Sequence, residues 1–164
     1  MELLKQLYGI SSKSGMEERM KSFVLDCVSD VELSVETDEI GNLFITKGEA
    51  ELYPCIAAHL DEIHSPCERT VIIEGNRIFT VDGLWNHVGC GADDKNGLWV
   101  IINLLHSEPI LKVALFVQEE RVGDNAGCRG ARACDLSFFN DVKFVLECDR
   151  KGSSDVVSIG KNEL

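Results

Sequence analysis

The second half of the sequence alternates between segments typical of helices and segments typical of strands. The apolar run Gly97–Leu105 has the length and pattern of a buried helix, and residues 126–134 form a second helical segment. Apolar strand segments follow these helices, at Val113–Val117 and Val142–Cys148. Alternating strands and helices require crossover connections between parallel strands. The pattern therefore predicts an α/β fold with a mostly parallel twisted sheet, helices on both faces and one or two β-hairpins.

The first half predicts two helices, two hairpins and one buried strand. Ser14 and Glu17 form the spacing of a capping box, in which each side chain bonds a free backbone N–H of the helix start. Gly75-Asn76 is a tight-turn dipeptide between two alternating segments. In chain order, the expected elements are helices over 2–8 and 14–28, hairpin strands over 31–35 and 43–46, a strand over 55–58, and hairpin strands over 70–74 and 77–81.

Composition excludes several classes of protein. The 164 residues suit a single domain over 1–164, and no apolar run approaches the length needed to span a bilayer. The net charge of −12 argues against nucleic-acid and anionic-membrane partners and favours cations. Seven cysteines without a CxxC pair indicate neither a disulfide framework nor a zinc ribbon. The N-terminus lacks the features of a signal peptide, so a cytoplasmic protein is expected.

Two adjacent carboxylates, Asp93 and Asp94, lie in the glycine-rich stretch Gly89–Gly97, directly before the apolar helix. Adjacent like charges in a tight turn repel each other, and burying them requires a cation or hydrogen-bond donors. This placement favours a nearby metal ion. The alternative is a solvated turn in which one aspartate caps the helix.

Further metal-type ligands follow the apolar strands. His59 and Asp61 come after strand 55–58, Glu119-Glu120 after strand 113–117, and Asp149 after strand 142–148. Taken singly, His59 suits a structural histidine, Glu119-Glu120 a solvated loop and Asp149 a surface ion pair. Because the carboxyl ends of parallel strands share one edge of a sheet, where ligands bind, we expect them to form one site.

These residues and their order resemble the co-catalytic di-zinc exopeptidases, a family that includes peptidase T, aminoacylases and related aminopeptidases and dipeptidases. The resemblance spans essentially the whole chain. It rests on Ala58–Asp61, Gly91–Gly97, Gln118–Glu120 and Leu146–Asp149, with support from Ser14–Glu17 and Asp38–Leu43. It implies a metal-dependent hydrolase that cleaves the peptide or amide bonds of small peptides or N-acyl amino acids with a metal-activated water.

The resemblance also implies a role for each residue. His59 and Asp149 would bind one zinc ion, Asp93 would bridge two ions, and Glu120 would bind the second. Asp61 would orient His59, Glu119 would be the general base, and the peptide bond after Asp93 would be cis. One or two zinc ions are expected, although cobalt or manganese suits the same ligands.

The family's second zinc takes one more histidine from beyond the matched region, so the chain resembles an exopeptidase truncated before that ligand. His64 or His87 could replace it, a partner chain could complete the site, or the second ion could bind weakly. Three hypotheses follow: a working exopeptidase, expected as a homo-oligomer; a truncated, inactive metal- or ligand-binding relative; and a regulatory binding module.

Overall fold

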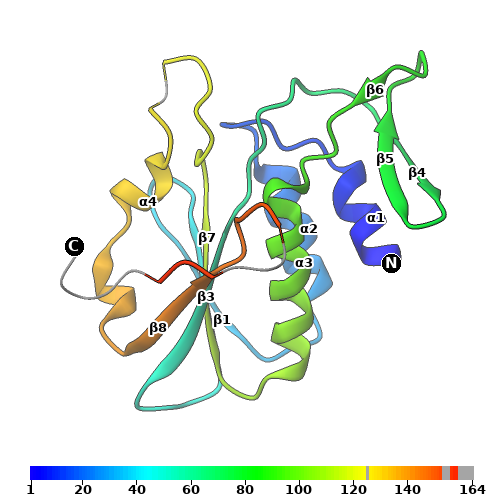
Figure 1. Cartoon of the computed structure of the whole chain (residues 1–164). Helices are drawn as coiled ribbons and strands as arrows, with labels where there is room; N and C mark the ends of the chain where they lie inside the picture. Colours follow the sequence, from blue (N-terminus) through cyan, green and yellow to red (C-terminus); the bar gives the residue numbers. More distant parts are fainter. Residues whose placement is uncertain (125, 153–155, 159–164) are drawn as a thin grey trace.

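The computed structural model describes residues 1–124, 126–152 and 156–158. Within them lie a five-stranded main sheet and a separate three-stranded sheet, with helices packed on the main sheet (Figure 1). The helices are α1 (Glu2–Gly9), α2 (Glu18–Cys27), α3 (Ala92–Ser107), α4 (Arg129–Ala133) and the 3-10 helix η1 (Leu136–Phe139). The strands are β1 (Ser34–Thr37), β2 (Leu43–Lys47), β3 (Tyr53–His59), β4 (Thr70–Glu74), β5 (Arg77–Val81), β6 (His87–Val88), β7 (Leu111–Phe116) and β8 (Val142–Glu147).

The main sheet has the strand order β1-β2-β7-β3-β8. Strand β3 runs parallel to both of its neighbours, pairing His59 with Phe116 of β7 and Ile56 with Leu146 of β8. The β1–β2 hairpin adds two antiparallel strands beside β7. These pairings confirm the predicted α/β class with a mostly parallel central sheet. The antiparallel β4–β5 pair forms the second predicted hairpin.

Apolar residues cover both faces of the main sheet. On one face, helices α1, α2 and α3 pack side chains such as Leu7, Met20 and Ile101 against alternate residues of the strands. On the other face, a smaller cluster centred on Phe44 is covered by Phe138 and Phe139. Figure 1 shows α4 on the opposite side of the sheet from α2 and α3. Because β3 and β7 are covered on both faces, they can be apolar almost throughout, as the sequence indicated.

Several predicted elements have different bounds in the structure. The first hairpin strand begins at Ser34 rather than at residue 31, because the N–H of Val31 bonds the carbonyl of Val28 in a turn that follows α2. The helix expected over 126–134 is also shorter. Gly127 and Cys128 have φ values of 84° and 52°, which are left-handed, so the helix begins only at residue 129.

The predicted capping box is wrong as a cap. Helix α2 begins at Glu18, and no side chain caps its N-terminus. The Glu17 carboxylate instead accepts hydrogen bonds from the N–H of Gly15, at 2.7 Å, and from the N–H of Gln118, at 3.1 Å. Glu17 therefore ties the segment before α2 to the loop after β7.

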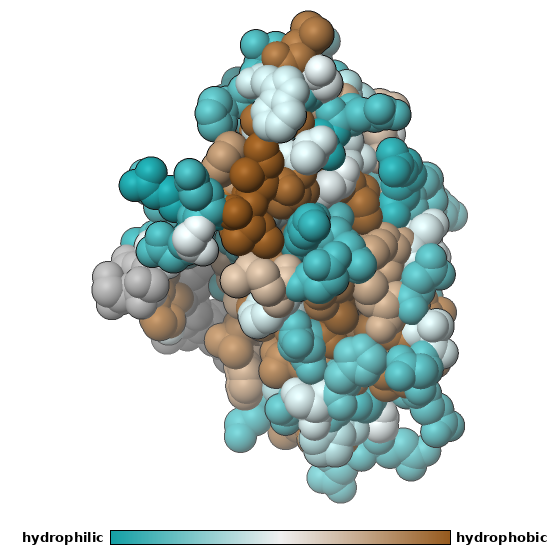
Figure 2. Space-filling model, turned by 90° about the vertical axis from the view of Figure 1, so that its right-hand side faces the viewer, coloured by the Kyte–Doolittle hydropathy of each residue, from teal (hydrophilic) through white to brown (hydrophobic). Residues whose placement is uncertain are grey.

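Two groups of exposed apolar side chains lie on the sheets. Around the β4–β6 sheet they include Ile73, Leu84 and Trp85. Figure 2 views this side of the molecule and shows apolar atoms gathered in its upper half between hydrophilic ones. Strand β8 lies at the edge of the main sheet, and its Phe144, Val145 and Leu146 are about half exposed. Within the described residues, no helix has both the length and the apolar character needed to cross a lipid bilayer.

Candidate metal centre

All the candidate site residues meet beyond the carboxyl ends of the three parallel strands. His59 is the last residue of β3, Glu119 and Glu120 follow β7, and Asp149 follows β8. Asp93 lies at the start of α3, which covers the same end of the sheet. Parallel strands with crossover connections leave this edge free for ligands. The topology therefore brings together residues that are up to ninety positions apart in the sequence.

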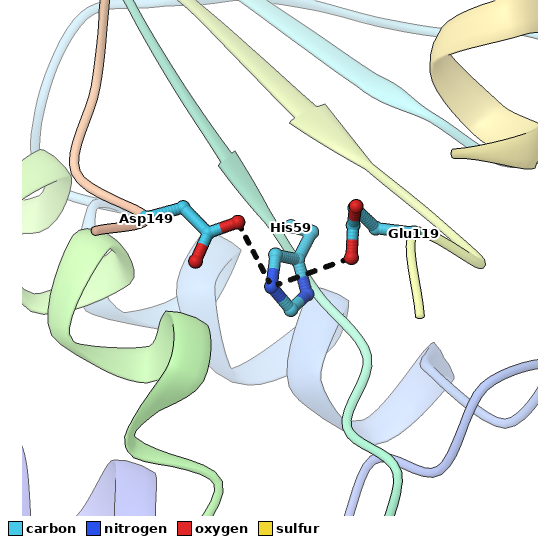
Figure 3. Close-up of side chains that lie close together, drawn as sticks. All are labelled: His59, Glu119 and Asp149. Carbon is cyan, nitrogen blue, oxygen red and sulfur yellow. Dashed lines mark ion pairs between the residues drawn. The ribbon is translucent and has the colours of Figure 1, made fainter. Parts of the chain in front are cut away.

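The His59 imidazole is at the centre of the cluster. Its Nε2 lies 3.9 Å from carboxylate oxygens of Glu119 and Asp149 (Figure 3). The same nitrogen lies 2.8 Å from Oδ1 of Asp93. The ring is almost fully buried, whereas the Glu119 and Asp149 side chains are 27% and 28% exposed. One face of the cluster is thus open enough for water or a small molecule to reach the carboxylates.

Asp61 lies on the buried side of the cluster. Its side chain is buried, and its two oxygens accept hydrogen bonds from the backbone N–H groups of Glu119, at 2.9 Å, and Glu120, at 3.1 Å. Its Oδ1 also lies 3.4 Å from Nδ1 of His59. One carboxylate therefore fixes the turn that carries the two glutamates and lies beside the inner nitrogen of the histidine. Ser14, expected to cap a helix, instead lies beside the same carboxylate.

The loop before α3 is held by a buried ionic cluster that the sequence did not predict. Glu62, Arg69 and Lys95 have buried side chains and form two ion pairs. Arg69 donates to the carbonyl of Gly89 at 2.7 Å, and Lys95 donates to the carbonyl of Cys90 at 3.1 Å. The cations thus fix the two carbonyls that precede the aspartates. Lys95 directly follows the Asp pair, but no sequence pattern linked it to Glu62.

The two adjacent aspartates have different environments. Asp94 is 1% exposed, and its Oδ1 accepts a hydrogen bond from the N–H of Gly97 at 3.0 Å, so this residue caps the regular part of α3. The Asp93 side chain is 67% exposed and points to His59. The peptide bond between them is cis, as the family resemblance implied. Asp94 therefore caps the helix as the alternative interpretation expected, although it is buried rather than solvated, and Asp93 stays a candidate metal ligand.

Crowding of carboxylates perturbs the titration of the cluster. Burial alone would lower the pKa of His59, but the neighbouring carboxylates of Asp61, Asp93 and Asp94 outweigh it and raise this pKa to about 10. Burial and the neighbouring Asp93 raise the pKa of Asp149 to about 7. Burial and Asp93 also raise the pKa of Glu120. A cation among these side chains would relieve the repulsion that raises the carboxyl pKa values.

The donor set fits a metal ion. Among the described residues, two groups place their ligand atoms within 4.8 Å of one another: His59, Glu119 and Asp149, and His59, Asp93 and Glu120. Ligands on a tetrahedral zinc ion, with bonds of about 2.0–2.1 Å, lie about 3.3 Å apart. The separations of 2.8 and 3.9 Å around His59 bracket that value. Imidazole nitrogen with carboxylate oxygens suits zinc, cobalt or manganese.

The other histidines near the site do not join these groups in the part of the chain that is described. His64 packs against the backbone of Gly89, where a Cβ atom would lie 1.9 Å from its Nε2. His87 is exposed on β6 and stacks beside Phe79. Neither replaces a second zinc-binding histidine, and His59 is shared by both groups.

Comparison with solved structures identifies the class of fold. The chain matches a tripeptidase from Staphylococcus aureus with a TM-score of 0.74 and 20% sequence identity. It matches aminopeptidase PepT from Bacillus cereus with a TM-score of 0.73 and 20% identity, and aminoacylhistidine dipeptidase from Vibrio alginolyticus with 0.69 and 19%. The chain thus has the fold of these peptidases, which confirms the expected zinc-exopeptidase-like architecture.

The matches cover most of this chain but less than half of each solved structure. They cover 92%, 91% and 93% of this chain, but only 43%, 42% and 33% of the respective peptidases. The chain therefore spans less than half the length of these solved structures. No protein-family model and no curated protein sequence matches the chain.

Proposed function

We propose that this protein is a metal-dependent hydrolase that cleaves peptide or amide bonds of small peptides or N-acyl amino acids. The observation that carries the proposal is the arrangement around His59. One buried imidazole faces the carboxylates of Asp93, Glu119 and Asp149, while Asp61 lies behind it. A fold shared with a tripeptidase, an aminopeptidase and a dipeptidase supports the same class of reaction.

The residues that would hold the metal are His59, Asp93, Glu120 and Asp149. Zinc at this position supplies Lewis-acid polarisation of a carbonyl oxygen and lowers the pKa of a water molecule to about 7. Asp61 holds His59 in the orientation for binding, and its hydrogen bonds to the Glu119–Glu120 backbone fix the turn. These ligands come from three strand ends and one helix start, so the folded sheet sets their geometry.

Glu119 is the proposed general base. Its Oε2 lies 3.9 Å from the His59 nitrogen that faces the metal position, and its side chain is partly open to solvent. A carboxylate there can take a proton from the attacking water and give it to the amine as the C–N bond breaks. Water oxygen thus becomes part of the carboxyl product, and the proton leaves with the amine.

The test is hydrolysis of di- and tripeptides and N-acetyl amino acids by metal-free protein to which zinc, cobalt or manganese is returned. Activity should require metal and disappear after chelation. Glu119→Gln should lower kcat by at least about a hundredfold, as loss of a general base does. The control Glu51→Gln, in the exposed loop between β2 and β3, should leave kcat unchanged.

Metal binding is measured separately by calorimetry. Zinc binding retained in Glu119→Gln, together with loss of turnover, would support a base rather than a ligand. Zinc binding without hydrolysis of any substrate in the wild type would support the alternative, an inactive metal- or ligand-binding relative. The sharing of His59 by two ligand groups makes one tightly bound ion the expected stoichiometry.

We also propose that the protein works as a homo-oligomer. Strand β8 has an unpaired edge within the described chain and exposes Phe144, Val145 and Leu146, a combination that favours pairing with another strand. Sedimentation should give a mass above 18.2 kDa. Phe144→Lys should lower that mass if the edge mediates the contact.

A further inference from the structure

The proposed base lies at the start of a loop that is closed by backbone hydrogen bonds. Residues 117–119 follow β7, and residues 128–130 return beside them. Gly130 donates to the carbonyl of Val117 at 3.0 Å, Arg129 donates to that of Gln118 at 3.0 Å, and Cys128 donates to that of Glu119 at 2.6 Å. Cys128 is therefore fixed directly opposite Glu119, although nine positions separate them.

The Cys128 thiol bonds the Glu119 carboxylate itself. Its Sγ donates to Oε1 at 3.1 Å. The other carboxylate oxygen, Oε2, is the one that lies 3.9 Å from Nε2 of His59. The two oxygens thus have separate partners, the thiol on one side and the metal position on the other. The left-handed φ of Cys128, at 52°, is part of the loop geometry that presents its side chain there.

The backbone around Glu119 is held independently of the thiol. Asp61 accepts a hydrogen bond from the Glu119 N–H, and the Cys128 N–H bonds the Glu119 carbonyl. Neither contact uses the Cys128 side chain, so both are expected to remain when that side chain is changed. The thiol therefore acts only on the rotation of the carboxylate, which distinguishes its role from a general structural one.

We infer that Cys128 is a positioning residue for Glu119, whose thiol holds Oε1 so that Oε2 faces the attacking water. This inference rests on the proposed function in assigning the base to Glu119. A misplacement of a reacting group by about 1 Å can cost a hundredfold in rate. A thiol is a weak hydrogen-bond donor, so a loss of about tenfold is the expected scale for its removal.

The kinetic test compares three variants with the wild type. Cys128→Ala should lower kcat about tenfold and leave KM unchanged, because substrate binding does not involve the thiol. Cys128→Ser retains a donor and should restore most of kcat. Cys134→Ala is the control, since this thiol of the same segment bonds the carbonyl of Ala131 and not Glu119. Circular dichroism and urea unfolding identify any variant that fails to fold.

A second readout does not depend on turnover. The S–H stretching band of Cys128, isolated by infrared difference spectra of wild type minus Cys128→Ser, should lie at low frequency because the thiol is hydrogen-bonded. Glu119→Leu removes the acceptor and should shift this band to higher frequency. The spectra should be recorded both with and without zinc.

The outcomes separate the inference from the proposed function. A band that does not move in Glu119→Leu overturns the inference whatever the activity, and so does an unchanged kcat in Cys128→Ala. Failure of the wild type to hydrolyse any substrate overturns the proposed function. In that case the band shift still decides whether the thiol holds the Glu119 carboxylate.

Discussion

Replacing Asp94 by asparagine is expected to stabilise the metal-free protein, and to do so more strongly at pH 8 than at pH 5. Asp94 is 1% exposed, and its burial raises its pKa from 3.8 to about 7. When folding raises the pKa of a carboxyl group, that group costs no stability at pH values below its pKa in the unfolded state. It costs stability progressively as the pH rises, until it is ionised in the folded state as well.

The size of the effect follows from the pKa difference. One pKa unit corresponds to about 1.4 kcal/mol, so the cost of ionised Asp94 is about 4 kcal/mol at pH 8 and about 1.5–2 kcal/mol at pH 5. Asparagine is neutral at both values and keeps an oxygen that can accept from the Gly97 N–H. The gain from Asp94→Asn should therefore increase by about 2–3 kcal/mol between pH 5 and pH 8.

Urea unfolding of the metal-free proteins at the two pH values measures this difference, with the fluorescence of Trp99 on α3 as a probe. Asp30→Asn, at an exposed position after α2, controls for the removal of one negative charge. An equal gain at both pH values, or a loss of stability at pH 8, would refute the explanation of the shift by burial.

Two further predictions test the scaffold of the site. Asp61→Asn should weaken zinc binding by about ten- to a hundredfold in calorimetry, because an amide offers one oxygen where the carboxylate uses two for the Glu119 and Glu120 N–H groups; unchanged affinity would exclude this supporting role. Gly130→Ala should cost about 1–3 kcal/mol in urea unfolding, since its Cβ would lie 2.4 Å from the carbonyl oxygen of Val117. The control Gly83→Ala meets no atom within 4 Å and should change stability by less than about 0.5 kcal/mol.

The sequence predicted the fold class and the meeting of the site residues for the same reason. Strands β3 and β7 are covered on both faces, so they appear in the sequence as apolar runs, and the polar residues after them are conspicuous. Once the strands were taken as parallel, His59, Glu119 and Asp149 had to share one edge. The roles assigned to these residues stay predictions until metal and substrate are tested.

Features that depend on contacts between distant segments could not be predicted. The short helix α4 begins late because residues 128–130 bond to the loop after β7, and no local pattern indicates that pairing. Glu17 suits a capping box by spacing, yet its carboxylate is used by Gln118, a hundred and one positions away. Glu62, Arg69 and Lys95 likewise lie in three separate segments, and only the folded chain shows their ion pairs.

The position of β8 would link the proposed metal binding at Asp149 thermodynamically to the covering of this strand. Asp149 directly follows β8, which pairs on one side with β3 and leaves its other edge open within the described chain. Anything that pairs with this edge restricts Asp149 as well, so it lowers the conformational entropy lost when a cation is bound. By reciprocity, a cation that fixes Asp149 strengthens the binding of the partner by the same factor.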